Sequence, residues 1–196
     1  MERRRVYSRE ELRFILEEQI LNLSSSGCPL KIINGIEAEL DNIIDVGFNK
    51  IYTNNNLPIL LSVPFNVWGY NEQIRSLAKH IGKDVEYCKN KEIDFIFKQI
   101  KKESCFKNAF HVLFDIERGK RFLMKKRRIL SIEEVIAYSF HCKERINFVS
   151  LNNELSGRKI NFLVRVRKNS ELSELEVSKC RYEEVEMKDV LISNGI

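Results

Sequence analysis

The sequence has few cysteines and no long apolar run, which excludes two classes of protein. Five cysteines are scattered along 196 residues, and no two lie closer than 17 positions. An odd and scattered set is typical of reduced cytosolic thiols rather than of a disulfide framework. The longest apolar runs, such as Leu57 to Phe65, are far shorter than the roughly 20 residues of a membrane helix. The first residues lead into a polar helix rather than an export signal. We therefore expect a cytoplasmic protein without a membrane partner.

The sequence also lacks the common catalytic motifs. It has three histidines and no HExxH, paired CxxC, P-loop, GxGxxG or GxSxG pattern. This absence argues against the common enzyme classes, although not against every enzyme. We assign no catalytic residue, no cofactor and no metal ligand, and we favour a non-enzymatic protein.

The composition indicates one ordinary globular domain. Hydrophobic residues make up 43% of the chain and charged residues 31%, and the apolar side chains are spread along its whole length. We expect a helical part over about residues 8–50, a sheet-containing part over about 57–180, and an acidic tail over about 181–196. Helical and strand patterns alternate, and the strands cluster late in the chain. This order favours an α+β fold with a mixed or mostly antiparallel sheet and helices mainly on one face.

Positive charge is concentrated in the middle of the chain. Residues 118–168 hold 14 basic and 4 acidic side chains, whereas residues 169–196 hold 3 and 7. Such a basic segment suits a polyanion or an acidic protein surface, and the acidic tail could fold back on it. The alternative is that these charges simply solvate an exposed hairpin. The first part of the candidate binding face comprises Arg118, Lys120, Arg121, Lys125, Lys126, Arg127 and Arg128.

A later strand adds two arginines to this face. Within residues 160–168 one set of alternate positions holds Phe162, Val164 and Val166, and the other set holds Leu163, Arg165 and Arg167. Successive side chains of a strand point to opposite faces, so one face is expected to be buried and the other largely basic.

Helical spacing and capping boxes predict the helices. Ser8 with Glu11, and Ser131 with Glu134, each match the capping box that begins a helix. The predicted helices span residues 9–23, 35–46 with Asn34 as cap, 71–81, 91–102 and 132–141. Gly47 lies where the second of these helices is expected to end.

Dense or alternating apolar runs predict the strands. They cover residues 57–63, 111–116, 121–124, 147–151, 160–166 and 175–180. The first run is continuously apolar, as in a strand buried on both faces. Residues 117–120 are expected to form a turn between the second and third strands.

Several isolated residues could carry chemistry, but a structural role is favoured for each. Cys105 with His111, or Cys142 alone, could supply a nucleophile, yet their spacing predicts no contact with a base. Asp115 and Glu117 could share one face of a strand and bind a metal or act as an acid and base pair. The ordinary interpretation is that Asp115 ends a strand and Glu117 starts a turn. Trp68 beside Tyr70 is expected to cover the edge of the core.

One supersecondary pattern resembles a known family. A strand, a D-x-E-R-G turn and a second strand over Val112–Phe122 are followed by an L-[ST]-x-E-E helix start over Leu130–Ala137. This order resembles a bacterial family of small proteins classed as a domain of unknown function, with a weaker echo over 57–64. The tail differs, because the family ends in a segment containing Gly, Trp and Cys and this chain in one rich in Glu and Lys. The resemblance implies architecture and no activity.

Three hypotheses of function follow. The first is a binding protein whose basic face contacts nucleic acid or an acidic protein. The second is a small enzyme with a site near Asp115, His111 and Trp68. The third is a homo-oligomer, which an apolar patch on the outer face of the first helix would indicate. The sequence leaves the oligomeric state open.

Overall fold

The computed structural model of the chain describes residues 4–53, 57–81, 85–88, 90–98, 100, 110–118, 128–141, 147–155, 158–168, 173–181, 183, 185–186 and 190–194. The predicted strand over 121–124 and the predicted turn at 119–120 lie outside these residues.

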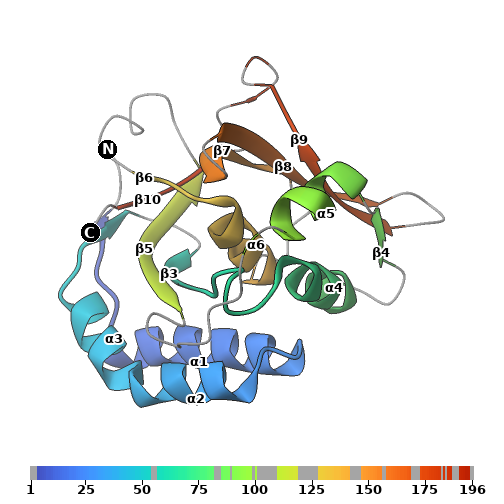
Figure 1. Ribbon diagram of the computed structural model, residues 1–196. Coiled ribbons are helices and arrows are strands. Elements are labelled where there is room, and N and C mark those ends of the chain that lie inside the picture. The colour runs from blue at the N-terminus through green and yellow to red at the C-terminus, as the bar shows by residue number, and fades with distance from the viewer. Residues whose placement is uncertain are drawn as a thin grey trace.

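Three helices from the start of the chain pack together beneath the rest of the molecule (Figure 1). They are α1 (Arg9–Ser25), α2 (Leu30–Ala38) and α3 (Leu40–Phe48). The capping box predicted for α1 is confirmed: Ser8 Oγ accepts a hydrogen bond from Glu11 N (3.1 Å), and Glu11 Oε2 accepts one from Ser8 N (2.8 Å). The helix is two residues longer than predicted.

The end of α1 explains the Ser and Gly cluster that follows it. Gly27 has φ +88°, a left-handed conformation that costs a glycine little. Gly27 N then donates to Ser24 O (3.1 Å) and Cys28 N to Leu23 O (3.0 Å), which satisfies two carbonyls at the helix end.

The prediction of one helix over 35–46 with Asn34 as its cap is wrong. Two helices meet at Glu39, and the first begins directly after Pro29. The buried positions keep helical spacing across the break, so periodicity could not reveal it. Gly47 does not end a helix but lies inside α3, where an added Cβ would come 3.1 Å from Ile59 Cδ1. A side chain at this position would require neighbouring side chains such as Ile59 to shift by a few tenths of an ångström.

The first sheet is antiparallel and contains two short strands, over 128–129 and 191–194, that the sequence did not predict. Its order is β3 (Leu57–Ser62), β5 (His111–Arg118), β10 (Leu191–Asn194) and β6 (Arg128–Ile129). Two further strands, β1 (Arg4–Arg5) and β2 (Tyr52–Thr53), form a separate two-stranded ribbon. The expected turn at Glu117 is wrong, because β5 continues through Arg118, where it pairs with β10. The chain near its end is thus partly a buried strand rather than only an acidic tail.

The second sheet is mixed and comes mostly from the later part of the chain. Its order is β4 (Val85–Cys88), β9 (Ser173–Lys179), β8 (Arg158–Lys168) and β7 (Asn147–Leu155). β4 is parallel to β9 and the other pairs are antiparallel. Strands predicted over 147–151, 160–166 and 175–180 correspond to β7, β8 and β9.

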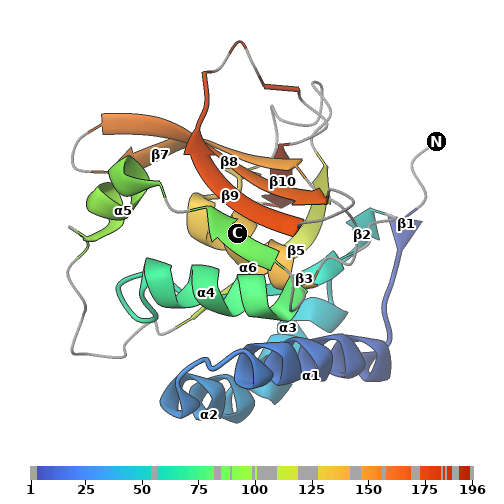
Figure 2. The same cartoon turned by 90° about the vertical axis from the view of Figure 1, so that its right-hand side faces the viewer.

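One helix lies between the two sheets, as two perpendicular views show (Figures 1 and 2). It is α6 (Ile132–His141), and it contacts β3 of the first sheet and both β7 and β8 of the second. All its residues from Glu134 to Phe140 are buried, because neighbours surround it on every side. The other two helices, α4 (Tyr70–Ile81) and α5 (Lys91–Lys98), lie beside it at the edge of the second sheet.

The α+β class and the mostly antiparallel pairing are therefore confirmed. A large cluster of buried apolar side chains joins the helices to both sheets, and a smaller one comprises Val149, Leu151, Val190 and Ile192. The strands divide between sheets instead of forming one, and α6 occupies the space between them. None of the helices in the described parts of the chain is long and apolar enough to span a membrane.

Candidate binding pocket

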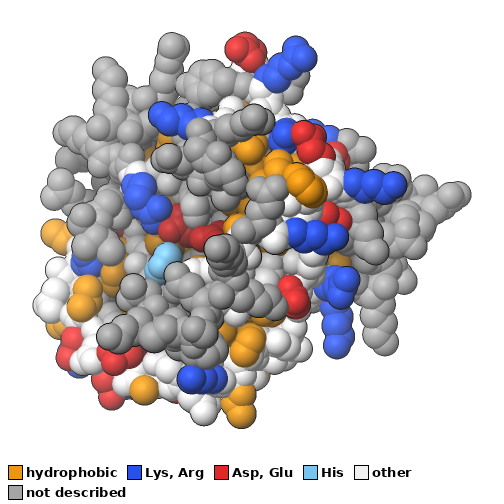
Figure 3. All heavy atoms as spheres, viewed as in Figure 1, with side chains coloured by type: hydrophobic (Ala, Val, Ile, Leu, Met, Phe, Trp, Pro, Cys, Tyr) orange, Lys and Arg blue, Asp and Glu red, His pale blue; other side chains and the backbone are white. Residues whose placement is uncertain are grey.

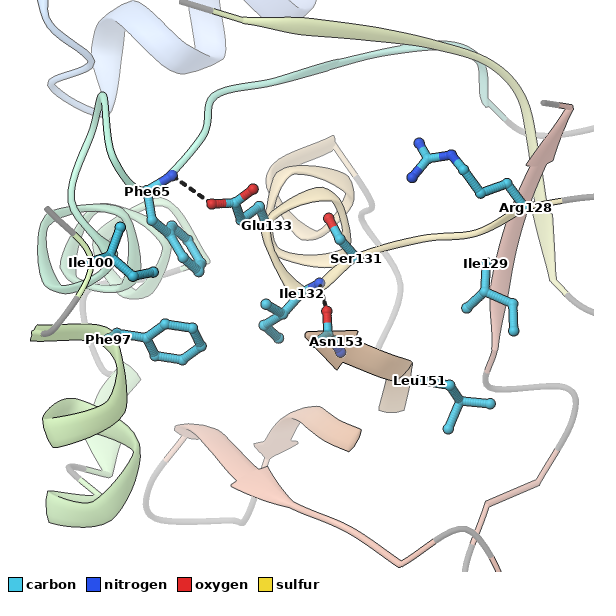
Figure 4. Close-up of a pocket in the computed structure, with 10 residues that line it drawn as sticks. All are labelled: Phe65, Phe97, Ile100, Arg128, Ile129, Ser131, Ile132, Glu133, Leu151 and Asn153. Atoms are coloured by element: carbon cyan, nitrogen blue, oxygen red, sulfur yellow. Dashed lines mark hydrogen bonds between the residues drawn. The ribbon is translucent and has the colours of Figure 1, made fainter. Parts of the chain in front are cut away.

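A half-open pocket of about 420 Å³ lies at the N-terminus of α6, between the two sheets (Figure 4). Segments far apart in the sequence meet there: the residues after β3, the end of α5, the strand β6, the start of α6, and β7. Its lining residues are Phe65, Phe97, Ile100, Arg128, Ile129, Ser131, Ile132, Glu133, Leu151 and Asn153.

One wall of the pocket is aromatic and rigid. The rings of Phe65 and Phe97 meet edge to face with centroids 5.0 Å apart. Phe97 also stacks on Tyr70 at 4.2 Å and lies 5.3 Å from Phe162. Because both phenylalanines are almost fully buried in this cluster, their positions are set by the core rather than by a ligand.

The start of α6 forms the floor of the pocket. Ser131 N donates to Glu134 Oε2 (2.8 Å), and Glu134 N donates to Ser131 Oγ at 3.4 Å. The capping box predicted from the sequence is thus present. It satisfies two backbone donors and fixes the direction in which the helix begins.

A second cap for α6 comes from the neighbouring sheet, and no pattern in the sequence indicates it. Asn153 Oδ1 accepts a hydrogen bond from Ile132 N (2.7 Å), the first amide of the helix. The Asn153 amide nitrogen donates to Ile160 O and to Ser150 O, each at 3.2 Å. A shift in the β7–β8 register between Ser150 and Asn153 turns this side chain toward the helix. The amide therefore ties α6 to the second sheet.

Arg128 and Glu134 form a fixed ion pair at the rim. Two nitrogens of the guanidinium donate to the two carboxylate oxygens, at 3.0 and 2.7 Å. The Glu134 side chain is only 5% exposed, whereas that of Arg128 is 49% exposed. Such a bidentate pair is directional, so it holds both groups in place.

Glu133 also lines the pocket, and unlike Glu134 it is not paired with Arg128. Its Oε1 accepts a hydrogen bond from Phe65 N at 2.7 Å (Figure 4). Burial raises the pKa of this carboxyl, the hydrogen bond from Phe65 opposes the rise, and the charge of Glu134 adds to it. Its second oxygen has no hydrogen-bond partner among the described residues. The protein therefore orients this carboxyl through one of its two oxygens.

The structure describes few of the predicted basic residues, and those few are paired. Lys120, Arg121, Lys125, Lys126 and Arg127 lie outside the described residues, as do the side chains of Arg118 and Arg167. Arg128 forms the ion pair with Glu134, and Arg165 lies 3.7 Å from Glu176 on the adjacent strand. The register also places Arg167 opposite Glu174.

These pairs follow from the strand order. The register of β8 with β9 sets Arg165 opposite Glu176 and Arg167 opposite Glu174. β9 ends at Lys179, so this pairing does not involve the acidic tail expected over about 181–196. On the face seen in Figure 3, the Lys and Arg side chains of the described residues are interspersed with Asp and Glu side chains.

The residues considered for catalysis do not gather in one place. Trp68 is buried and stacks on Phe140 at 6.0 Å, so the prediction that it covers the core is confirmed. Asp115 is buried at a bulge of β5 with φ +56°. Burial raises the pKa of Tyr52, and the negative charge of Asp115 adds to the rise. Asp115 therefore acts on Tyr52, which is not one of the residues considered for catalysis. His111 is exposed at the start of β5.

The remaining candidates are unsuited to nucleophilic or metal chemistry or lie outside the described residues. Cys105, Cys142 and the Glu117 side chain lie outside the described residues. Cys28 is buried, and burial raises the pKa of its thiol to about 12. No group of three or more His, Cys, Asp or Glu side chains able to hold a metal ion occurs in the described ranges.

A histidine at the other end of α6 is also notable. Both ring nitrogens of His141 are buried and without a hydrogen-bond partner among the described groups. Burial, followed by the charge of nearby His80, lowers the pKa of His141 to about 3. His141 is therefore neutral at physiological pH.

Comparison with protein-family models, with curated proteins and with solved structures gives no match for this chain.

Proposed function

We propose that the protein binds a small organic molecule in the pocket at the N-terminus of α6. The observation that carries this proposal is the combination of volume and lining. About 420 Å³ falls within the range of roughly 300–1,000 Å³ of ligand pockets, which are mostly apolar with a few polar groups. This pocket has six apolar lining residues and four polar or charged ones.

The rigidity of the walls supports the proposal. The phenylalanines are fixed by aromatic contacts, the helix start by its two caps, and Arg128 by Glu134. A site that is already ordered loses little conformational entropy when a ligand enters, which favours binding.

Binding of p-cresol, a neutral ring with one hydroxyl, tests the proposal. Saturation-transfer NMR is expected to detect it on the unmodified chain. Ile129→Trp places a large ring in the pocket from its half-buried edge and is expected to weaken binding at least about tenfold. Val185→Trp is the matched control, because Val185 is also half-buried but does not line the pocket.

Two results would reject this proposal. One is the absence of any p-cresol signal on a folded unmodified chain. The other is equal affinity of p-cresol for the unmodified chain and for Ile129→Trp, provided that the thermal midpoint shows the variant to be folded.

A second candidate function is contact of the basic segment 118–128 with nucleic acid or an acidic protein. Its support is the balance of 14 basic to 4 acidic side chains over residues 118–168. A cytoplasmic location, inferred from the scattered cysteines, would give the segment access to such partners. Phosphate contacts predict retention of nucleic acid during purification and its steep release by salt.

Charge reversal separates this candidate from the pocket. Lys125→Glu, Lys126→Glu and Arg127→Glu are combined, and Arg128 is kept because Glu134 needs it. The control combines Lys79→Glu, Lys91→Glu and Lys98→Glu at exposed positions. Equal nucleic-acid retention by the two triple variants would reject the basic segment as the contact.

A further inference from the structure

We propose that the pocket selects ligands in which a protonated amine is joined to an aromatic or branched aliphatic body, with Glu133 as the group that recognises the amine. This inference rests on the proposed function, and it adds the chemical class of the ligand. It depends on the charges, the hydrogen bonds and the walls of the pocket.

Among the described residues, the charged groups that line the pocket, together with Glu134, do not cancel. The Glu134 carboxylate accepts hydrogen bonds from two guanidinium nitrogens of Arg128 and from the backbone amide of Ser131. Because Arg128 is committed to Glu134 in this way, it does not neutralise Glu133. The lining and this partner together hold two carboxylates and one guanidinium, so the pocket has a surplus acidic group.

The position of Glu133 prepares it to accept a donor from a ligand. The bond from Phe65 N fixes Oε1 and therefore the plane of the carboxylate. The second oxygen is left with its lone pairs unused by the described residues. A partly buried carboxylate has lost some of its favourable interactions with water. A charge-assisted hydrogen bond from a cationic donor compensates for this loss better than a neutral donor does.

The apolar walls define the rest of the ligand. Phe65 and Phe97 lie on one side of Glu133, the Ile132 side chain extends from the helix start toward Phe97, and Leu151 lies on the other side of the helix start (Figure 4). An aromatic wall also attracts a cation through the negative faces of its rings. An anionic ligand would meet Glu133 without relief from Arg128, and a small inorganic cation would leave the apolar walls unfilled.

Three ligands of similar shape test the charge preference on the unmodified chain. They are 2-phenylethylamine, 2-phenylethanol and phenylacetate, with dissociation constants measured by NMR titration at pH 7. A charge-assisted hydrogen bond corresponds to a preference of about 10- to 100-fold for the amine over the alcohol. Phenylacetate is expected to bind more weakly than the alcohol.

Glu133→Gln then tests the residue. The glutamine oxygen can still accept the hydrogen bond from Phe65, so the fold is expected to persist. The preference for the amine over the alcohol is expected to fall to about twofold or less, because the neutral amide can no longer form a charge-assisted hydrogen bond. Glu37→Gln makes the same chemical change at an exposed position of α2 and is expected to keep the preference.

The outcomes separate this inference from the one on which it rests. If p-cresol binds but 2-phenylethylamine binds no better than 2-phenylethanol, the charge selection is wrong and the pocket remains a ligand site. An unchanged amine preference in Glu133→Gln would also overturn the inference. If neither p-cresol nor any of the three ligands binds, both proposals fail. The ligand series alone decides the matter if Glu133→Gln does not fold.

Discussion

At the scale of single residues, Gln19 shows how one polar side chain can hold a helix to a sheet. It lies on the buried face of α1 and is 2% exposed. Its side-chain nitrogen donates to Ile59 O (2.6 Å), and its oxygen accepts from Leu61 N (2.8 Å). Among the described strands β3 pairs with β5 alone, so on its other side the Gln19 amide takes the place of a peptide group of a neighbouring strand.

Replacement of Gln19 is therefore expected to be costly. Gln19→Leu keeps the size of the side chain but leaves a buried carbonyl and a buried amide without partners. Unfolding by urea is expected to show a loss of about 2–4 kcal/mol. Glu17→Leu, at an exposed position of the same helix, is expected to change stability by less than about 0.5 kcal/mol. Similar losses in the two variants would contradict this role of Gln19.

A second residue prediction concerns pH. His141 is neutral in the folded state down to about pH 3, whereas in the unfolded chain it gains a proton below about pH 6.5. The unfolded state then binds more protons, so the free energy of unfolding decreases as the pH falls from about 6.5 toward 3. The stabilisation is complete above this window.

The variant His141→Leu removes this titration. Between pH 7.5 and 5 the unmodified chain is expected to lose about 1–2 kcal/mol more than the variant does, as measured by urea unfolding at both values. His111→Leu serves as the control, because His111 is exposed. Identical pH dependence in the unmodified chain and in His141→Leu would refute the prediction.

At the scale of elements, local patterns were predictable and long-range ones were not. The capping boxes at Ser8 and Ser131 involve neighbours in sequence, so they could be identified without a structure. Gln19 could not, because periodicity counts only apolar side chains and the partners of Gln19 are backbone groups 40 residues away. The strand β10 is four residues long and follows an acidic stretch, which left no alternation long enough to detect.

The candidate site illustrates the same limit. The sequence directed attention to Arg128 through its basic neighbours, and to the start of α6 through its capping box. In the structure Arg128 is paired with Glu134 at the rim of the pocket, so it is not a free cation. Glu133 and Asn153 were missed, because their roles depend on Phe65 and on the bulge of β7.

The two caps of α6 allow a prediction at this scale. Ser131→Ala removes a cap within the helix's own segment, at a cost of about 1 kcal/mol. Asn153→Ala removes a buried amide that joins the helix to β7 and β8, and a loss of about 2–3 kcal/mol is expected. The two variants are compared by thermal and urea unfolding. A larger loss for Ser131→Ala would show that the link to the sheet is unimportant.

At the scale of the whole molecule, the central position of α6 defines the most stable region. Its side chains from Glu134 to Phe140 are buried, and it contacts both sheets as well as α1 and α4. By contrast, α2 lies at the outside of the molecule with several exposed residues (Figure 2). Regions that open only on global unfolding exchange their amide hydrogens most slowly.

Hydrogen exchange measured by mass spectrometry tests this order. Peptides covering 132–141 are expected to exchange only with global unfolding, whereas those covering 30–38 are expected to exchange at least about tenfold faster. Addition of a low concentration of urea is expected to accelerate the first set more steeply, because its opening exposes more surface. Equal rates in the two regions would contradict a central role for α6.

The bond between Gln19 and β3 has a consequence beyond stability. A strand with an open side is a template on which other copies of a chain can add and grow into fibrils. In β3 the Gln19 amide occupies the backbone groups of Ile59 and Leu61 on that side, and all of Leu57–Ser62 is buried. Gln19 therefore blocks part of the strand edge at which a second chain could otherwise add.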